Sequence, residues 1–386
     1  MADLSASASR GFFDLAPSDE YDPKAIGLAF SGGGYRATLF HAGAVIRLGE
    51  LGLLSKIDRI SSVSGGSITT GILAMAWPKL KFENSTGVVD PKTLMDNFTV
   101  PVLKATARTI DISVGIAGLV PFISAGNKLS EIYDRKIFHG MKLKDLPEHP
   151  KFIFNATNLQ TGGLFRFTRD YLADWRALKS TTKTIRLSDA VAASSAFPPV
   201  LAPLRLDLRN ETVVVPEGSR WSHFELLKEP ILVDGGVYDN LGLESIWKRC
   251  GIILAGYAGH NAEAEAVNFT YDHLLPMVNA FLAASIDWRE ATLVRLFKHK
   301  LADGIGERIG AYWTAGTDID AYPAKKAGWA PTPAELAKAR DLPTRLARFS
   351  PSEQTAALNA GYAYADRAIR AYLLPDAALP TGAPGK

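Results

Sequence analysis

The sequence predicts an α/β protein with a mainly parallel central sheet and helices on both faces. Two consecutive strand–loop–helix units near the N-terminus support this prediction, with an apolar strand at residues 26–30 and a strand of apolar or β-tolerant residues at 60–63. Consecutive units of this kind form parallel sheets with right-handed crossovers, and strands that are buried on both faces are apolar throughout. The length of 386 residues and the 47% hydrophobic content are sufficient for a large core.

The first unit follows residues 1–23, which are small and polar and predict a flexible N-terminal arm. The strand at 26–30 leads through a glycine-rich loop into a predicted helix over 37–51. The first half of this helix is apolar nearly all round, which is typical of a helix packed inside a domain. Gly52, just past its end, suits a left-handed cap.

The glycine-rich loop, SGGGYR at residues 31–36, brings bare backbone close to whatever binds there. The N–H groups of Gly33 and Gly34 could stabilise an oxyanion, with Gly32 supporting the turn. For Arg36 three roles stay open: reinforcing such an oxyanion hole, binding a phosphate group, or forming a surface ion pair.

The same loop also matches a dinucleotide-binding fingerprint in its alanine-ended form, Gly32-x-Gly34-x-x-Ala37. Sites of that kind place an acidic residue at the end of the second strand. Here the second strand leads to a serine instead. Nucleotide binding is therefore the less favoured interpretation.

The second unit is centred on Ser64, in the stretch Ser62-Val63-Ser64-Gly65-Gly66 between the second strand and a predicted helix over 68–77. The pattern is that of a G-x-S-x-G nucleophile elbow in which Ser62 replaces the first glycine. A sharp strand-to-helix turn exposes the serine hydroxyl at a helix N-terminus and needs very small neighbours, here Gly65 and Gly66. The N–H of Gly65 would be a further oxyanion donor.

Residues 78–150 interrupt the strand–helix rhythm with helix-like stretches and several prolines, and predict an inserted helical region that could serve as a lid. The apolar segment at 110–123 is too short to span a bilayer and contains Asp111. A buried helix pair is the favoured interpretation of this segment, and a pocket cap or a lipid contact is the alternative.

The second half of the chain returns to strands. A strand at 152–158 and a hairpin partner at 164–168 come first, and Ser188 is the predicted N-cap of a helix over 189–196. Short alternating runs over 204–233 predict an antiparallel edge. The remaining expected features are a strand ending at Asp234-Gly235-Gly236, a cap at Asn240, a strand at 252–257, and helices over 271–299 and 350–374.

We expect a catalytic domain over 24–310, a C-terminal helical extension over 311–374 and a disordered tail over 375–386. Reactive groups gather outside the carboxyl ends of the strands in an open parallel sheet. Three loops are expected at that edge, namely those that carry the glycines, Ser64 and Asp234.

A serine needs a base to take its proton. Asp234 could act on Ser64 directly, with Gly235 and Gly236 supporting its turn, or His260 could complete the order Ser, Asp, His that is found in other hydrolases. The residues alone leave this choice open. His41 lies within an apolar helix, where a core role is favoured.

Composition limits the other possibilities. The formal net charge of +3 is too small to indicate a nucleic-acid partner, and it does not oppose docking on an anionic membrane. The single cysteine, Cys250, excludes an internal disulfide. No signal-peptide pattern and no transmembrane segment is visible, so a cytoplasmic or peripheral membrane location is expected.

Taken together, the glycine loop, the Ser64 elbow and Asp234-Gly235-Gly236 resemble the patatin-like phospholipase family. The segments FNATNLQTGGLFRF at 154–167 and AVAASSAFPPVLAPL at 190–204 resemble it as well, so that about residues 25–260 are covered. The replacements by Ser62 and Ala37 depart from the family motifs without touching the reacting atoms.

The resemblance implies a three-layer α/β/α fold and a Ser–Asp dyad, with Ser64 as nucleophile and Asp234 as general base. It also implies hydrolysis of lipid acyl esters without a metal, a cofactor or a catalytic histidine, and it assigns Gly33, Gly34 and Arg36 to the oxyanion-hole segment. The expected partner is a phospholipid or another acyl-ester lipid at a membrane surface. A soluble esterase or thioesterase, or a silent lipid-binding protein, is the alternative.

Overall fold

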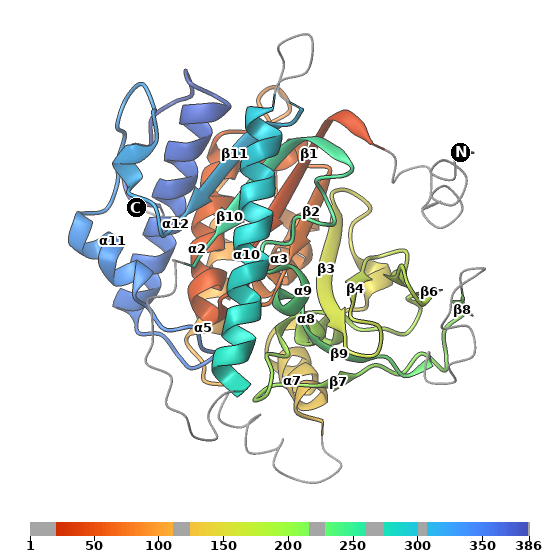
Figure 1. Ribbon diagram of the computed structural model, residues 1–386. Helices are drawn as coiled ribbons and strands as arrows, with labels where there is room; N and C mark the ends of the chain where they lie inside the picture. The colour runs from red at the N-terminus through yellow and green to blue at the C-terminus, as the bar shows by residue number, and fades with distance from the viewer. Residues whose placement is uncertain (1–20, 111–123, 216–227, 260–273, 300–306, 385–386) are drawn as a thin grey trace.

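The computed structural model describes residues 21–110, 124–215, 228–259, 274–299 and 307–384 (Figure 1). The N-terminal arm up to residue 20, the apolar segment 111–123 and His260 lie outside the described residues.

A parallel half-sheet forms the middle of the molecule (Figure 1). Its strands are largely buried, as expected for strands covered on both faces. In spatial order they are β11 (Ile309–Thr314), β10 (Cys250–Tyr257), β1 (Asp22–Phe30), β2 (Arg59–Ser62) and β3 (Lys151–Asn158). This confirms the two predicted N-terminal strands and the parallel pairing between them.

An antiparallel half continues from β3, beginning with the predicted hairpin. The strands beyond β3 are short. Two further strands form a side branch, in which one strand pairs with β3 and the other pairs with that strand. The main path consists of β4 (Gly163–Phe167), β5 (Leu172–Asp174), β6 (Leu178–Ser180) and β8 (Val213–Val214). The side branch consists of β9 (Ile231–Asp234), which pairs with β3, and β7 (Leu204–Arg205), which pairs with β9.

Strand β9 differs from the expectation that its loop leaves a parallel strand. It pairs antiparallel with β3, with Asp234 opposite Ala156, whereas Ser62 at the end of β2 pairs with Phe154. Because β3 extends past the end of β2, β9 runs back along this extension. The last residue of β9 therefore still reaches the edge where β2 ends.

Helices cover both faces of the sheet, which gives the three-layer arrangement (Figure 1). Alternate residues of β1 belong to different clusters of buried side chains: Leu28 and Phe30 pack on the side of α2 (Gly34–Glu50), and Ala29 packs on the side of α10 (Leu274–Lys298). This alternation follows from the two-residue period of a strand. The first face also carries α3 (Gly65–Ala76), α8 (Leu187–Ser195) and α12 (Pro351–Tyr372).

Helix α12 packs along α2 at unusually short range. A Cβ on Gly361 would lie 1.7 Å from the carbonyl oxygen of Phe40, and one on Gly43 would lie 1.9 Å from that of Leu358. The Arg47 guanidinium of α2 also pairs with Asp366 of α12 at 2.8 Å, with both side chains buried. The C-terminal helix is therefore part of the core around the first helix.

The described parts of region 78–150 contain helices joined by loops, together with two isolated bridges, Phe82–Val89 and Lys142–Arg186. The predicted helices are present, and a lid role stays a prediction. The region contains two π-helical segments, η4 and η5, each continuing an α-helix. Its elements are α4 (Pro91–Leu94), η4 (Met95–Thr99), α5 (Val100–Thr106), α7 (Ala125–Tyr133), η5 (Asp134–Phe138) and η6 (Leu143–Asp145).

Short helices occupy several connections. They are η2 (Leu54–Lys56), η3 (Trp77–Lys79), α9 (Gly236–Asp239), η8 (Ile319–Ala321) and α11 (Pro333–Arg340).

Two predicted caps are wrong. The N-cap of α8 is Arg186 and not Ser188, because the carboxylate of Asp189 accepts from the Arg186 backbone N–H at 3.0 Å and so closes the first turn two residues earlier. Asn240 follows the short helix α9 as its C-terminal cap and begins no helix.

Strand β11 crosses the expected domain boundary at residue 310, so the C-terminal part begins inside the sheet. Residues 375–384, the described part of the predicted tail, contact the rest of the chain through Asp376, which pairs with Lys325 at 2.7 Å, and Ala378, whose carbonyl accepts from Arg47. Among the described residues, no helix has the length and hydropathy that crossing a bilayer requires.

Candidate active site

Ser64 stands between β2 and α3 in a strained conformation. Its backbone angles are φ 51° and ψ −119°, and among the described residues only His139 shares a positive φ without being glycine. Such a conformation is unfavourable for a residue with a side chain and persists only where the surroundings enforce it. The predicted elbow is therefore present, and it holds the Ser64 side chain partly exposed at the N-terminus of α3.

The two glycines after Ser64 are required by close backbone packing. A Cβ on Gly65 would lie 2.0 Å from the carbonyl oxygen of Gly34, and one on Gly66 would lie 2.7 Å from those of Phe30 and Ser31. The elbow therefore rests directly on the glycine loop after β1. These contacts bring the first two predicted motifs together.

A chain of serine hydroxyls supports the elbow from beneath. Ser62 Oγ lies 3.0 Å from Ser67 Oγ, which lies 2.8 Å from Ser194 Oγ at the end of α8. Ser194 in turn accepts a hydrogen bond from the Ser64 backbone N–H at 3.0 Å. The serine that replaces the first glycine of the elbow thus belongs to this network and does not reach the reacting atoms.

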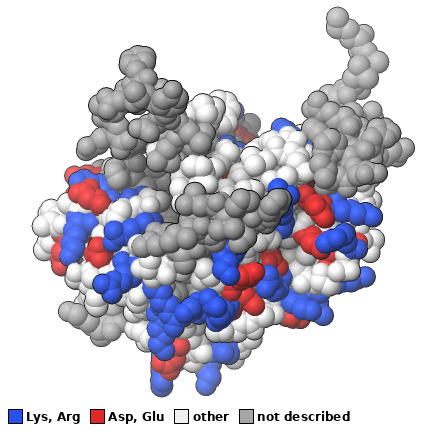
Figure 2. Space-filling view, turned by 90° about the horizontal axis from the view of Figure 1, so that it is seen from below, with Lys and Arg blue, Asp and Glu red and all other residues white. Residues whose placement is uncertain are grey.

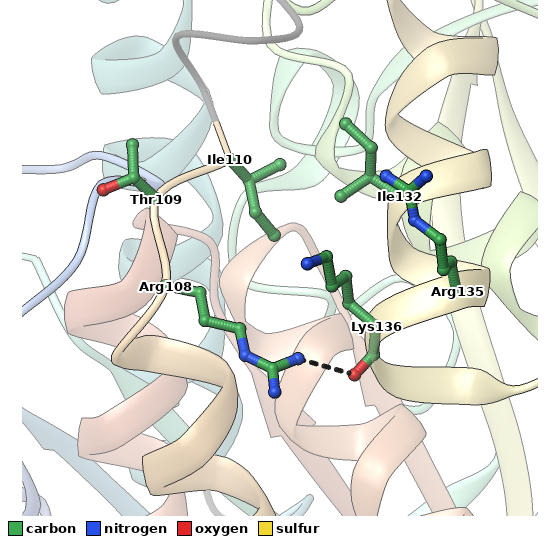
Figure 3. Close-up of a pocket in the computed structure, with 6 residues that line it drawn as sticks. All are labelled: Arg108, Thr109, Ile110, Ile132, Arg135 and Lys136. Carbon is green, nitrogen blue, oxygen red and sulfur yellow. Dashed lines mark hydrogen bonds between the residues drawn. The ribbon is translucent and has the colours of Figure 1, made fainter.

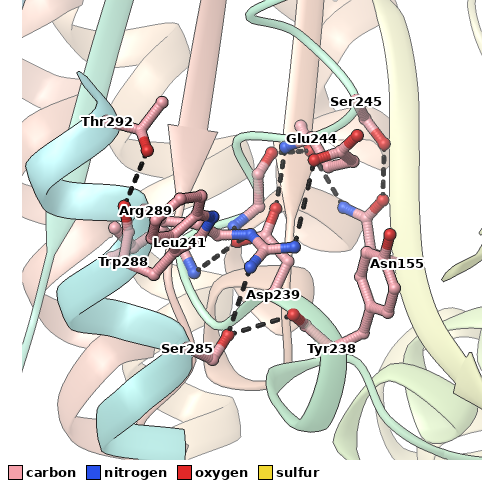
Figure 4. Close-up of polar contacts among 12 residues, drawn as sticks. Asn155, Tyr238, Asp239, Leu241, Glu244, Ser245, Ser285, Trp288, Arg289 and Thr292 are labelled. Carbon is pink, nitrogen blue, oxygen red and sulfur yellow. Dashed lines mark hydrogen bonds and ion pairs between the residues drawn. The ribbon is translucent and has the colours of Figure 1, made fainter. Parts of the chain in front are cut away.

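Asn155 of β3 connects this network to the neighbouring loops. Its side-chain N–H group donates to Ser61 Oγ and to the Ser62 carbonyl, both at 2.9 Å, and its Oδ1 accepts from Ser245 at 2.7 Å (Figure 4). Its backbone carbonyl accepts from Ser194 Oγ at 2.6 Å. Neither Asn155 nor Ser194 was singled out from the sequence, although each lies in a stretch that resembles the family.

Asp234, the predicted base, is buried and lies beside Ser64. Burial raises the pKa of its carboxyl group from 3.8 to about 7, although hydrogen bonds from the Gly236 N–H and from the Ser64 side chain lower it. The Gly236 bond is 2.8 Å long. A Cβ on Gly235 would lie 2.2 Å from the Asn155 carbonyl, so the turn after Asp234 is packed against β3.

The glycine loop supplies unpaired donors next to Ser64. The Gly32 N–H donates to the Asn240 carbonyl at 3.1 Å, and a Cβ on Gly32 would lie 3.2 Å from the Ser64 Cβ. By contrast, the N–H groups of Gly33, Gly34 and Gly65 have no acceptor within the described residues. Gly34 and Gly65 open α2 and α3, where the first N–H groups lack an intrahelical partner.

Arg36 points behind this loop. Its side chain is 9% exposed, and Nη1 donates to the Leu342 carbonyl at 2.8 Å. A Cβ on Gly33 would lie 3.7 Å from Nη2, and burial lowers the pKa of the guanidinium. Of the three predicted roles, the surface ion pair is wrong, since the guanidinium is buried and bonds to backbone carbonyls. Its position beside Gly33 is consistent with support of the loop.

His41 is a core residue, as favoured from the sequence. It is fully buried, its Nε2 lies 3.1 Å from the Ser31 carbonyl oxygen, and burial lowers its pKa to about 3. The ring is therefore neutral near pH 7. The alternative base, His260, lies outside the described residues.

Helix α10 lies beside Tyr238 and Asp239, which follow the Asp234 turn (Figure 4). Arg289 of this helix pairs with the buried Asp239 at 2.9 Å, and Ser285 donates to the Tyr238 carbonyl at 3.0 Å. Leu282 reaches the Asp234 turn, where a Cβ on Gly236 would lie 3.1 Å from it. Neither the Asp239–Arg289 pair nor this contact was anticipated from the sequence.

Solved structures with a similar fold include human GIVD cytosolic phospholipase A2, with a TM-score of 0.52 and 12% sequence identity. The similarity covers 90% of this chain and 61% of the human one, so this chain spans about three fifths of its length. The same human protein bound to methyl gamma-linolenyl fluorophosphonate gives a TM-score of 0.51 and 13% identity, with 92% and 58% of the two chains covered.

Comparison with curated protein sequences gives no match. The family model of the patatin-like phospholipases matches residues 28–247, which is more than half of the chain and includes the glycine loop, the elbow and the Asp234 turn. The chain therefore belongs to the patatin-like phospholipase family.

Proposed function

We propose that this protein is a lipid acyl hydrolase that cleaves carboxylic esters through an acyl-serine intermediate, with Ser64 as nucleophile and Asp234 as general base. The observation that carries the proposal is the pairing of a strained serine with a buried carboxyl group whose pKa is about 7. A base works best when its pKa lies near the operating pH. An ordinary aspartate would be too weak for this task.

In the proposed first step, Asp234 accepts the hydroxyl proton while Ser64 Oγ attacks the ester carbonyl carbon. The N–H groups of Gly33, Gly34 and Gly65 are the proposed donors to the oxyanion. The bond to the alcohol then breaks, and the alcohol leaves with the proton from Asp234. In the second step, water gives its proton to Asp234 and attacks the acyl-serine. The fatty acid leaves, and the proton returns to Ser64.

Support for a lipid substrate comes from family membership and from the human phospholipase A2 of similar fold, which has been solved with a fluorophosphonate that carries a fatty chain. Fluorophosphonates react with activated serines, so such a probe tests the nucleophile directly. We expect the wild-type protein to be labelled and Ser64→Ala not to be labelled. Ser55→Ala, an exposed serine before β2, is the matched control and should be labelled like the wild type.

Fatty-acid release from phospholipids, lysophospholipids and triglycerides, with Ser64→Ala as blank, tests the reaction. A rate that rises when the substrate aggregates supports a lipase. Equal rates on dispersed short esters and on aggregates would favour the soluble esterase or thioesterase. No labelling and no release would favour a silent lipid-binding protein and contradict the proposal.

A further inference from the structure

An open pocket of about 470 Å³ lies outside the candidate active site, between the chain after α5 and the helical segment α7–η5 (Figure 3). Its lining is basic with an apolar wall. Three cationic side chains and three other residues form it: Arg108, Arg135, Lys136, Thr109, Ile110 and Ile132.

The cations of the pocket are available for an anionic ligand. Arg108 is held by a hydrogen bond of 3.2 Å from Nη1 to the Lys136 carbonyl, an acceptor without a formal charge (Figure 3). Within the described part of the chain, no carboxylate forms an ion pair with Arg108, Arg135 or Lys136. The nearest acidic neighbours along α7–η5 are engaged elsewhere, since Glu131 pairs with Lys128 and Asp134 faces Arg186 at 3.7 Å.

Both walls of the pocket are tied to the elements of the candidate active site. The Ile110 N–H donates to the Leu346 carbonyl at 2.9 Å, and the neighbouring Arg345 carbonyl accepts from the Tyr35 N–H of the glycine loop, also at 2.9 Å. On the other wall, the Phe138 ring at the end of η5 lies 2.8 Å from where a Cβ on Gly71 of α3 would be. The pocket is therefore connected to the glycine loop through the backbone at Arg345 and Leu346, and to α3 through Phe138.

The other side of the site carries exposed apolar side chains. Met277, Phe281 and Trp288 of α10 are 50%, 61% and 69% exposed, and spacings of four and seven residues place them on one helix face. Leu282 of the same helix contacts the Asp234 turn. Figure 2 shows Lys and Arg side chains interspersed with Asp and Glu on the face seen from below. Exposed apolar and aromatic side chains together with cations are typical of surfaces that bind anionic lipid bilayers.

We propose that Arg108, Arg135 and Lys136 bind the phosphate monoester of an anionic lipid headgroup, and so hold the candidate active site against the bilayer. A phosphate monoester carries a charge of about −1.5 to −2 near pH 7 and offers three acceptor oxygens, which suits a pocket with two guanidinium groups and an ammonium group. The membrane setting of this inference rests on the proposed function. The phosphate site itself rests on the pocket.

The test measures binding of the full chain to vesicles on a Ser64→Ala background, so that hydrolysis plays no part. Vesicles of phosphatidylcholine alone are compared with vesicles that also contain phosphatidic acid, or phosphatidylserine at matched surface charge. We expect the tightest binding to phosphatidic acid vesicles. The triple variant Arg108→Gln, Arg135→Gln, Lys136→Gln should weaken it by about 100-fold, at about fivefold per charge.

The matched control removes three exposed lysines that do not line the pocket, through Lys56→Gln, Lys79→Gln and Lys81→Gln. It should weaken binding by less than about threefold. A double variant, Arg108→Lys with Arg135→Lys, keeps the charges and should retain most of the binding. Thermal melting of each variant checks its folding. Equal losses in both triple variants would show that charge alone governs binding and would overturn the pocket.

A soluble-phosphate arm separates the two sources of the ligand. Glycerol phosphate at millimolar concentration should displace the protein only weakly from phosphatidic acid vesicles. Displacement at micromolar concentration would assign the pocket to a soluble phosphate ester and overturn the lipid assignment. The proposed hydrolase fails separately, since fluorophosphonate labelling of the wild type does not depend on vesicle binding.

Discussion

Replacing Asp234 by asparagine should abolish hydrolysis and at the same time stabilise the folded protein. Burial raises the pKa of this carboxyl group from 3.8 to about 7, so its ionised form is destabilised in the fold relative to the unfolded chain. A group whose pKa is raised on folding favours the folded state below its unfolded value, and this contribution is lost as the pH rises through the folded value. Between about pH 4 and pH 7, ionisation of Asp234 therefore costs the wild type stability.

The size of the effect follows from the two pKa values. The difference of about 3 pH units corresponds to about 4 kcal/mol at pH 8, and at pH 5 the cost is only about 1.6 kcal/mol. The unfolding entropy of a chain of 386 residues is about 0.8 kcal/mol per degree. Dividing the two free-energy costs by this entropy predicts that the variant melts about 5 °C above the wild type at pH 8 and about 2 °C above it at pH 5. The asparagine side chain of the variant does not titrate, so the variant escapes both costs.

The assay combines thermal melting of both proteins at pH 5 and pH 8 with hydrolysis of a dispersed ester from pH 5 to pH 9. We expect Asp234→Asn to melt above the wild type, by more at pH 8 than at pH 5. The wild-type kcat/KM should rise with pH and level off above about pH 7, because only the ionised base accepts the proton. Asp366→Asn is the control, since it breaks the buried pair with Arg47 and should lower the melting temperature.

Two results would refute this reasoning. A variant that melts below the wild type at pH 8 would show that the Asp234 carboxylate is not destabilised by burial. A rate that stays constant between pH 5 and pH 8 would show that Asp234 does not act as the base.

Three further predictions concern the surroundings of the site and the core. Ser194→Ala should lower kcat by up to about tenfold, because the Ser64 backbone N–H loses the hydroxyl acceptor at 3.0 Å and keeps only the Ser194 carbonyl at 3.1 Å; an unchanged kcat would contradict the positioning role. Gly65→Ala should abolish fluorophosphonate labelling, since its Cβ would lie 2.0 Å from the Gly34 carbonyl oxygen, and full labelling would show that the elbow can relax. Asp366→Asn should destabilise the fold by about 3–5 kcal/mol in a denaturation experiment, whereas Asp376→Asn, in an exposed pair, should change it by about 1 kcal/mol or less. Equal effects of the last two variants would contradict the importance of burial.

The sequence was sufficient for the local elements of the site because each carries a strong local signal. Two strand–helix turns were predicted from the buried-type strands before Gly32 and Ser64 and from the glycines that follow them, and the structure contains both. The turn at Ser64 needs small neighbours, and the sequence itself shows glycine at positions 65 and 66. The raised pKa of Asp234 was not predictable, since it depends on burial, which distant residues provide.

The remaining features depend on long-range contacts that leave little local pattern. The direction of β9 could not be predicted, because its run of four residues, Ile231–Asp234, reads alike whether its neighbour is parallel or antiparallel. Ser188 resembled an N-cap by residue type, but the Asp189 carboxylate caps the Arg186 N–H instead. Asn155 and Ser194 resemble ordinary core residues until β3 and α8 are seen to meet beneath the elbow.

The C-terminal part completes the geometry of the glycine loop, although the family model ends at residue 247. The Tyr35 N–H donates to the Arg345 carbonyl, Arg36 donates to the Leu342 carbonyl, and a Cβ on Gly34 would lie 2.6 Å from the Arg345 oxygen. The backbone around 342–345 therefore packs closely against one side of the loop, and the elbow packs closely against the other side. Glycine at position 34, with φ at 56°, is the residue that fits between two such surfaces. The proposed oxyanion donors are thus positioned by contacts with the N-terminal elbow at Ser64 and with the C-terminal segment 342–345.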